Sequence, residues 1–341
     1  MLQKRTGKLK KRLARMLVLS MMAGIAGLGM GCRRGFGKEA QGKVKVVASI
    51  YPVYDFVQKV GGDQVAVLML VPSGTEPHTW EPSSRDMLVL EEADMFVYNG
   101  AGMEAWAEDI TQSVQNKDLM IVEASCEVEL LKIDHDEDHE EDHDEEHEEH
   151  DHEDEHEDHD EEGHHHHGEF DPHVWLSPEN AKIEMRTIME ALKKADPEHA
   201  EIYEKNFQAA SQECDKLDAE YRAALSPYEG KHIVVAHEAY GYLCHAYGLE
   251  QIGIEGVSAD QEPDAARMRE IIDMAKEYDI KCIFFEELVD PKVAKTIADE
   301  AGCQTAALSP LDGLTKEDID SGREYFSVMR DNLNSILKAF A

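Results

Sequence analysis

The stretch VKVVASIYPVYDFVQKVGGDQVAVLML, residues 44–70, decides the fold. Two apolar runs of strand length, 44–50 and 65–70, enclose an amphipathic segment near 53–60. A strand, a helix and a second strand of this size form a βα unit, in which the two strands lie parallel. The sequence therefore predicts an α/β fold built on a mostly parallel sheet.

The same alternation continues along the chain. Apolar runs at 95–98 and 119–122 complete a first set of four predicted strands, and helical segments lie near 84–93 and 103–115. A second set lies at 232–237, 251–257, 281–287 and 304–308, with helical patterns near 239–247, 264–279, 291–301 and 315–340. Two long helical patterns, 178–195 and 197–226, separate the sets. We predict two lobes, each with a mostly parallel four-stranded sheet flanked by helices, joined by one long rigid linker helix.

The length of 341 residues is sufficient for two lobes with hydrophobic interiors. From the composition shifts we predict a signal peptide (1–31), a lipidated tether (32–42), an N-terminal lobe (43–195), a linker helix (196–227) and a C-terminal lobe (228–341).

The first 31 residues have the pattern of a secretory signal. Seven Lys and Arg side chains within residues 1–15 precede a largely apolar stretch, 16–30. This stretch is shorter than the roughly 20 residues of a membrane-spanning helix, so it fits the apolar region of a signal peptide. It ends at Gly31-Cys32, which is similar to a bacterial lipoprotein signal. We expect Cys32 to be lipidated and the protein to be held outside the cytoplasm on the cell membrane; ordinary cleavage and an uncleaved anchor are the alternatives.

Charge restricts the class of partner. The chain has 72 acidic and 34 basic residues and a net charge of −38, which excludes a nucleic-acid binder that works by neutralising phosphates. Much of the acid lies in residues 134–169, where 36 residues hold 22 Asp or Glu, 12 His and two Gly. With no apolar residue to bury, this loop is expected to be disordered.

The acidic run has two interpretations. It is either a solvated polyanion without a role or a weak collector of divalent cations, because closely spaced imidazoles chelate metal and the excess of carboxylates attracts it. The residues expected to collect metal with low affinity are His135, His139, His143, His147, His150, His152, His156, His159, His164, His165, His166 and His167.

Three other histidines lie at positions suited to a cleft. His78 follows the run 65–70, His173 directly precedes a predicted helix, and His237 ends the run 232–237. In open α/β sheets, ligands bind where loops converge at the carboxyl ends of strands. Imidazole nitrogens are good ligands for zinc, which takes four ligands in a tetrahedron.

Asp312 follows the last predicted strand, so its loop lies at the same sheet edge as His237, and it is the expected fourth ligand. Glu76, two residues before His78, is the alternative. Other readings stay open: a histidine after a strand can be a core or capping residue, His78 lies between prolines, and Asp312 before Gly313 can serve only as a turn former.

The remaining histidines and cysteines are expected to be structural. We interpret His199 and His232 as surface residues and His245 as a packing residue. No CxxC pair is present, which argues against a cysteine zinc knuckle. A disulfide between Cys282 and Cys303 is a hypothesis, because each opens an apolar run.

Seven motifs, in order along the chain, resemble the solute-binding proteins of zinc and manganese ABC transporters, the high-affinity zinc uptake group (cluster A-I). They are VVASIYP (46–52), EPHTWEPS (76–83), DPHVWLSP (171–178), VVAHEAYGY (234–242), EPDA (262–265), IFFEE (283–287) and LSPLDGLT (308–315). The metal ligands of this family fall on His78, His173, His237 and Asp312.

The resemblance implies a protein that captures Zn²⁺ in the interlobe cleft and delivers it to a membrane permease, and we expect a monomer. The manganese members of the family have a carboxylate where His237 stands, and three nitrogen ligands favour zinc. A manganese-binding paralogue and a surface adhesin are the alternatives. We expect no enzyme activity, because Gly241 stands where a zinc hydrolase of the HExxH kind requires its second histidine.

Overall fold

The computed structural model describes residues 35–133, 169–257, 263–286, 288 and 290–340, and the described residues from Phe36 onward belong to one compact unit. The predicted signal peptide, Cys32 and the twelve histidines of the acidic run lie outside the described residues. Within the described part of the chain, no helix has both the length and the apolar character needed to cross a membrane.

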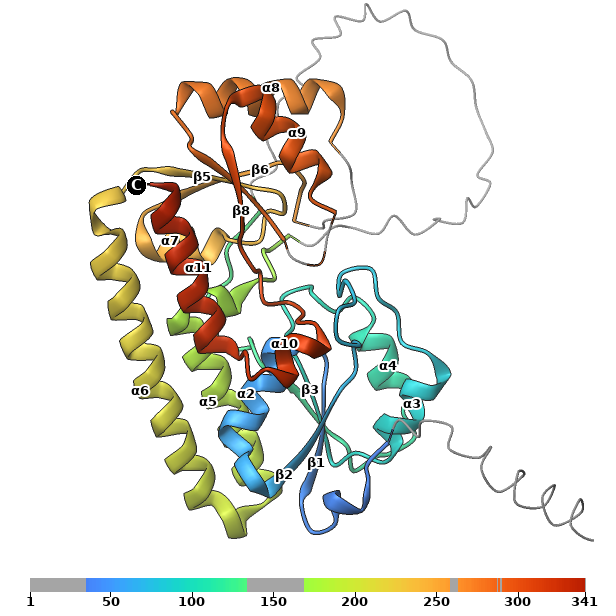
Figure 1. Cartoon of the computed structure of the whole chain (residues 1–341). Helices are drawn as coiled ribbons and strands as arrows, with labels where there is room; N and C mark the ends of the chain where they lie inside the picture. The colour runs from blue at the N-terminus through green and yellow to red at the C-terminus, as the bar shows by residue number, and fades with distance from the viewer. Residues whose placement is uncertain (1–34, 134–168, 258–262, 287, 289, 341) are drawn as a thin grey trace, which may run out of the picture. The chain divides into compact units, whose positions relative to one another are not determined.

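The first sheet has four parallel strands in the order β2-β1-β3-β4 (Figure 1). The strands are β1 (Val44–Ala48), β2 (Val65–Met69), β3 (Met95–Tyr98) and β4 (Met120–Glu123), and the helices of this part are α2 (Tyr51–Gly61), α3 (Ser84–Glu91) and α4 (Ala107–Ser113). All four strands lie within the predicted runs or one residue beyond them.

The second sheet repeats this order as β6-β5-β7-β8, again with all strands parallel. Its strands are β5 (His232–Val235), β6 (Glu250–Gly253), β7 (Cys282–Phe285) and β8 (Gln304–Ala307), and its helices are α7 (Gly241–Tyr247), α8 (Ala265–Glu277), α9 (Lys292–Ala301), α10 (Lys316–Asp320) and α11 (Tyr325–Ala339). The predicted α/β class with two four-stranded parallel sheets is therefore confirmed.

Two long helices connect the sheets, α5 (Pro178–Ala195) and α6 (Ala200–Leu225). The helix α6 packs against α5, α2 and α11, so it contacts elements from both ends of the chain (Figure 1). Short 3-10 helices complete the structure: η1 (Lys38–Ala40), η2 (Gly62–Gln64), η3 (Val174–Leu176), η4 (Pro197–His199) and η5 (Ser226–Tyr228).

One predicted helix is wrong. The pattern 315–340 is not continuous, because α10 ends at Asp320 and α11 begins at Tyr325. Gly322 has a φ of 86°, outside the helical region, and the Glu324 carboxylate accepts hydrogen bonds from the Phe326 and Ser327 amides as the cap of α11. A glycine and a capping residue thus override the apolar periodicity.

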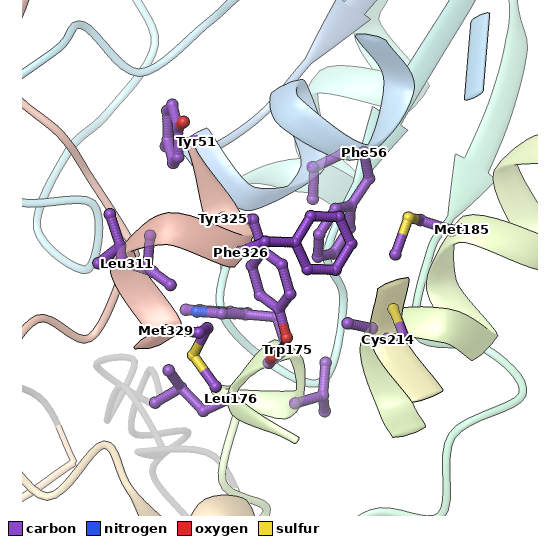
Figure 2. Packing of buried hydrophobic residues seen from close by; sticks show 14 of the residues in the cluster. Tyr51, Phe56, Trp175, Leu176, Met185, Cys214, Leu311, Tyr325, Phe326 and Met329 are labelled. Carbon is purple, nitrogen blue, oxygen red and sulfur yellow. Dashed lines mark hydrogen bonds between the residues drawn. The ribbon is translucent and has the colours of Figure 1, made fainter. Parts of the chain in front are cut away.

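The two sheets share one hydrophobic core. A single cluster of buried side chains contains Phe56 of α2, Trp175 of η3 and Tyr325 of α11 (Figure 2). The rings of Phe56 and Tyr325 meet edge to face at 5.0 Å, and the Tyr325 hydroxyl donates to the Trp175 carbonyl oxygen at 2.7 Å. Residues far apart in sequence therefore pack in one interior, which limits independent movement of the lobes.

Two smaller hypotheses fail. Cys282 and Cys303 are both free thiols, although β7 and β8 are neighbouring strands. Cys303 lies just before the strand residue Gln304 that pairs with Cys282, and its Sγ contacts the Ile280 carbonyl oxygen. His245 is exposed on α7, so the prediction that it packs is wrong.

Candidate metal centre

Four predicted ligands come together at one point. The side chains of His78, His173, His237 and Asp312 each offer a donor atom, and these atoms all lie within 4.8 Å of one another. The three imidazole ring centres are 4.8–5.2 Å apart. His173, His237 and Asp312 are buried, whereas His78 is partly exposed.

The place of the cluster follows from the topology. In both sheets the strand order reverses between the first and third strands (β1 and β3, β5 and β7), and such a switch point is where open α/β sheets bind ligands. His237 follows β5 and Glu286 follows β7, so they flank the switch point of the second sheet. Asp312 follows β8 and His78 follows β2.

His173 is held in a defined orientation by a carboxylate. Asp171 Oδ1 accepts hydrogen bonds from the backbone amide of His173 at 2.9 Å and from its Nδ1 at 2.8 Å. With the proton on Nδ1, the lone pair lies on Nε2, which is 3.2 Å from the Nε2 of His78. Burial, together with the charge of His237, holds the pKa of His173 well below its ordinary value, so the ring is neutral.

His78 is also neutral and is fixed through its backbone. Its amide donates to the Glu76 Oε1 at 3.1 Å, and His78 itself lies between Pro77 and Pro82. Burial and the two neighbouring histidines hold the pKa of His78 well below its ordinary value. A neutral imidazole is the form that ligates a metal ion.

His237 differs from the other two histidines. Its Nδ1 lies 2.6 Å from the Glu286 Oε1, and its Nε2 lies 2.7 Å from the Val257 carbonyl oxygen. Both neighbours are acceptors, so both ring nitrogens carry protons in this arrangement. Burial lowers its pKa, but the charges of Glu286 and Asp312 outweigh burial and raise it to about 10. Metal binding at Nε2 requires that this proton leave and that the contact with Val257 break.

Asp312 supplies a buried oxygen with no protein donor. Its side chain is 3% exposed, and Oδ2 has no hydrogen-bond partner among the described residues. Burial and the charges of Glu286 and Glu76 raise its pKa well above the ordinary value. A buried carboxylate oxygen without a partner is costly unless a cation or proton accompanies it.

The donor set fits Zn²⁺. Three imidazole nitrogens and one carboxylate oxygen match the number and type of ligands that zinc takes, and carboxylates hold the second nitrogen of two of the three rings. Glu76, the alternative fourth ligand, belongs to a different group, with Glu286 and Asp312, in which the oxygens also lie within 4.8 Å of one another.

Two residues at the site had no predicted role. Asp171 and Glu286 lie in motifs that mark the family resemblance. Asp171 contacts His173, two residues away, whereas Glu286 contacts His237 across 49 residues of sequence. For Asp171 the signal was its place two residues before His173, and for Glu286 it was that the run 281–287 ends at the same sheet edge as the run 232–237.

A family model described as the periplasmic component A of the zinc-uptake complex, ZnuA, matches residues 46–339. The chain belongs to the ZnuA family. The predicted resemblance is therefore confirmed.

Curated relatives agree with this family. The zinc-binding protein AdcA of Streptococcus pyogenes serotype M3 is 44% identical over 298 residues, which are 87% of this chain and 56% of that protein. The high-affinity zinc uptake system protein ZnuA of Bacillus subtilis is 38% identical over 312 residues, 92% of each chain. The chain thus spans about half the length of the AdcA relatives but nearly all of the Bacillus protein.

A solved structure of a ZnuA-like domain shares the fold. The crystal structure of the Zn(II)-bound ZnuA-like domain of Streptococcus pneumoniae AdcA matches with a TM-score of 0.70 and 35% identity, over 87% of this chain and 99% of that chain.

Proposed function

We propose that this chain is the extracytoplasmic solute-binding component of a zinc ABC transporter, which binds Zn²⁺ at His78, His173, His237 and Asp312 and delivers it to a membrane permease. The observation that supports this most directly is the convergence of these four side chains, from loops of both sheets, within 4.8 Å. Membership of the ZnuA family and the zinc-bound relative support the same ion.

The donor set favours zinc over manganese. Imidazole nitrogen suits Zn²⁺, whereas Mn²⁺ prefers carboxylate and water oxygens. Three ligands here are imidazoles, and the protein holds two of them by carboxylates at Nδ1. Four protein ligands leave no open position for a reactive water, which is why we expect transport rather than hydrolysis.

Release is expected to need only a small movement. The lobes share a continuous core, so wide separation would expose buried aromatic residues such as Trp175 and Tyr325. A small rocking of the lobes would move His78 away from His237 and weaken the site.

Membrane attachment and weak zinc collection are two further parts of the proposed function. Lipidation of Cys32 would hold the protein, as a monomer, on the outer face of the membrane beside the permease, and the histidines of residues 134–168 would collect zinc weakly nearby. Replacing Cys32 by Ala is expected to release the protein from the membrane fraction.

The decisive test is metal titration without the acidic run. The chain on either side of residues 134–168 is held together, since Lys132 and Phe170 form an antiparallel bridge and the Ile133 amide donates to the Glu169 carbonyl oxygen at 3.1 Å. A short Gly-Ser turn can therefore replace the run. Calorimetry with Zn²⁺ should show one tight equivalent, with much weaker Mn²⁺ binding.

The variant His173→Ala should lose this equivalent. His232→Ala is the matched control, because His232 pairs with Glu250 at the opposite end of β5; it should bind zinc normally. Absence of a tight equivalent in the unsubstituted protein would show that the four-ligand site is wrong.

A further inference from the structure

We propose that Glu76, Glu286 and Asp312 form a second cation position, an entry site made only of oxygen ligands, through which a divalent cation passes to the three histidines. This inference rests on the proposed function. It assigns a step in metal capture to a group of residues beside the proposed four-ligand site of His78, His173, His237 and Asp312, called the tight site below. The two groups share one member, Asp312.

The three carboxylates come from three separate loops. Glu76 lies in the loop after β2, Glu286 follows β7 and Asp312 follows β8, yet their oxygens lie within 4.8 Å of one another. Carboxylate oxygens are hard ligands that take hydrated divalent cations, and a concentration of negative charge in a cleft raises the rate of cation capture.

Two further observations indicate an occupant for this group. Asp312 Oδ2 is buried and has no hydrogen-bond partner among the described residues. A cavity of about 10 Å³ lies against the two buried members, Glu286 and Asp312, and not against Glu76; Leu288, Asp318 and residues within 309–315 form its other walls. This is room for about one water-sized atom.

The exposure of the three carboxylates indicates which of them an incoming cation contacts first. Glu76 is partly exposed, whereas Glu286 and Asp312 are 4% and 3% exposed. A cation that meets Glu76 first is therefore led inward to the two buried carboxylates.

The loops that carry the group are tied together. The Gly74 amide donates to the Leu314 carbonyl oxygen at 3.1 Å, which joins the Glu76 loop to the Asp312 loop. A Cβ on Gly313 would lie 3.5 Å from the Thr75 carbonyl oxygen, so the two backbones pass close to each other.

Asp312 links the two positions. It belongs both to the oxygen group and to the group with His78, His173 and His237. A cation can keep Asp312 as a ligand while it exchanges the other oxygens for imidazole nitrogens. Nitrogen ligands bind zinc more strongly, so the ion comes to rest among the histidines.

The test measures the association and dissociation rates of zinc separately from its dissociation constant. Glu76→Gln removes the charge but keeps an oxygen that can accept from the His78 amide. Glu81→Gln is the matched control. Glu81 is an exposed carboxylate in the same loop, so its substitution removes the same charge. Zinc association and dissociation would be followed by stopped flow against a fluorescent chelator, in the complete mature chain, with His173→Ala as the blank for zinc held by residues 134–168.

If the oxygen group is an obligatory step, E76Q should slow association and dissociation together, each by about tenfold, with the dissociation constant changed less than about twofold. The control E81Q should retain both rates. Rates of E76Q equal to those of E81Q would overturn the entry site while leaving the tight site intact. Faster dissociation with unchanged association would also overturn it and would make Glu76 a ligand of the tight site. If the unsubstituted chain binds no more tightly than the blank, the proposed function fails instead.

Discussion

At the scale of single residues, the site depends on the carboxylates behind its imidazoles. Asp171 and Glu286 each accept a hydrogen bond from the Nδ1 of a proposed ligand, at 2.8 and 2.6 Å. Such partners fix the orientation of the ring and raise its basicity, and their loss typically weakens metal binding 10- to 100-fold. The carboxylates therefore decide how well the imidazoles bind, although neither Asp171 nor Glu286 is among the four proposed ligands.

We predict that Glu286→Gln weakens zinc binding by about tenfold. The amide keeps the shape and one acceptor oxygen, but the charge that stabilises His237 is lost. Competition against a chromophoric chelator measures the change. Glu250→Gln is the matched control, because it removes a carboxylate from another histidine pair, with His232, away from the site. Equal affinities for E286Q and the unaltered protein would show that the carboxylate has no part in binding.

The sequence predicted which four side chains come together, but not the carboxylates that support them. His78, His237 and Asp312 follow strand-like runs, so their common edge is readable from a parallel topology. The partnership of His237 with Glu286 spans 49 residues and depends on which strands are neighbours, which no local pattern reveals. The strand order β6-β5-β7-β8 supplies that information.

At the scale of elements, the strands and the long helix α5 (178–195) were predictable, whereas the break within 315–340 was not. Apolar runs of four to seven residues are shorter than most helices, so their length favours a buried strand. The break between α10 and α11 lies inside a continuous apolar periodicity, and it depends on Gly322 and the Glu324 cap, which compete with that periodicity.

The carboxyl ends of β1 and β3 carry a buried polar network. Glu104 Oε1 accepts from the Ser49 hydroxyl at 2.5 Å and from the Asn99 amide at 2.9 Å. The Asn99 side chain donates to the Pro172 carbonyl oxygen at 3.0 Å, directly before His173. The network thus joins the first sheet to a proposed ligand.

This network predicts a pH dependence of stability. Burial raises the pKa of Glu104 from 4.5 to about 7, although its hydrogen bonds oppose the shift. Between these values the folded state keeps a proton that the unfolded chain has lost, so the free energy of unfolding falls as the pH rises from about 4.5 through about 7. The loss attributable to Glu104 is on the order of 2–3 kcal/mol.

The glutamine side chain in the variant Glu104→Gln cannot ionise, so this variant should lack the part of the pH-dependent loss of stability that Glu104 causes. Denaturant unfolding of the zinc-free protein at pH 5 and pH 8 gives the comparison, and the exposed Glu108→Gln serves as the control. If E104Q and the unaltered protein lose the same stability between the two pH values, Glu104 ionises in the folded state as freely as in the unfolded chain.

At the scale of the whole molecule, two sheets with the same strand order share a single interior. The largest buried cluster includes Val46 of β1, Tyr221 of α6 and Met329 of α11. The Tyr221 hydroxyl donates to the Met329 carbonyl oxygen at 2.6 Å, which joins α6 to α11. Separating the lobes would expose this layer to water.

We therefore predict that the zinc-free protein unfolds in one transition. Trp80 and Trp106 report on the first sheet, Trp175 reports on the shared core, and the thiols of Cys282 and Cys303 report on the second sheet. Tryptophan fluorescence and thiol labelling should give the same denaturant midpoint. Met329→Ala removes a fully buried side chain and should cost about 2–5 kcal/mol.

The shift produced by Met329→Ala distinguishes a shared core from two independent lobes. With a shared core, both midpoints fall together, although Met329 lies on α11 and the tryptophans do not. With independent lobes, the thiol midpoint falls and the fluorescence midpoint of Trp80 and Trp106 stays. Asn334→Ala, on the exposed side of the same helix, should leave both in place. Coincident shifts would mean that movement of the lobes during metal release is opposed by the whole core, and that it must be small enough to leave this layer packed.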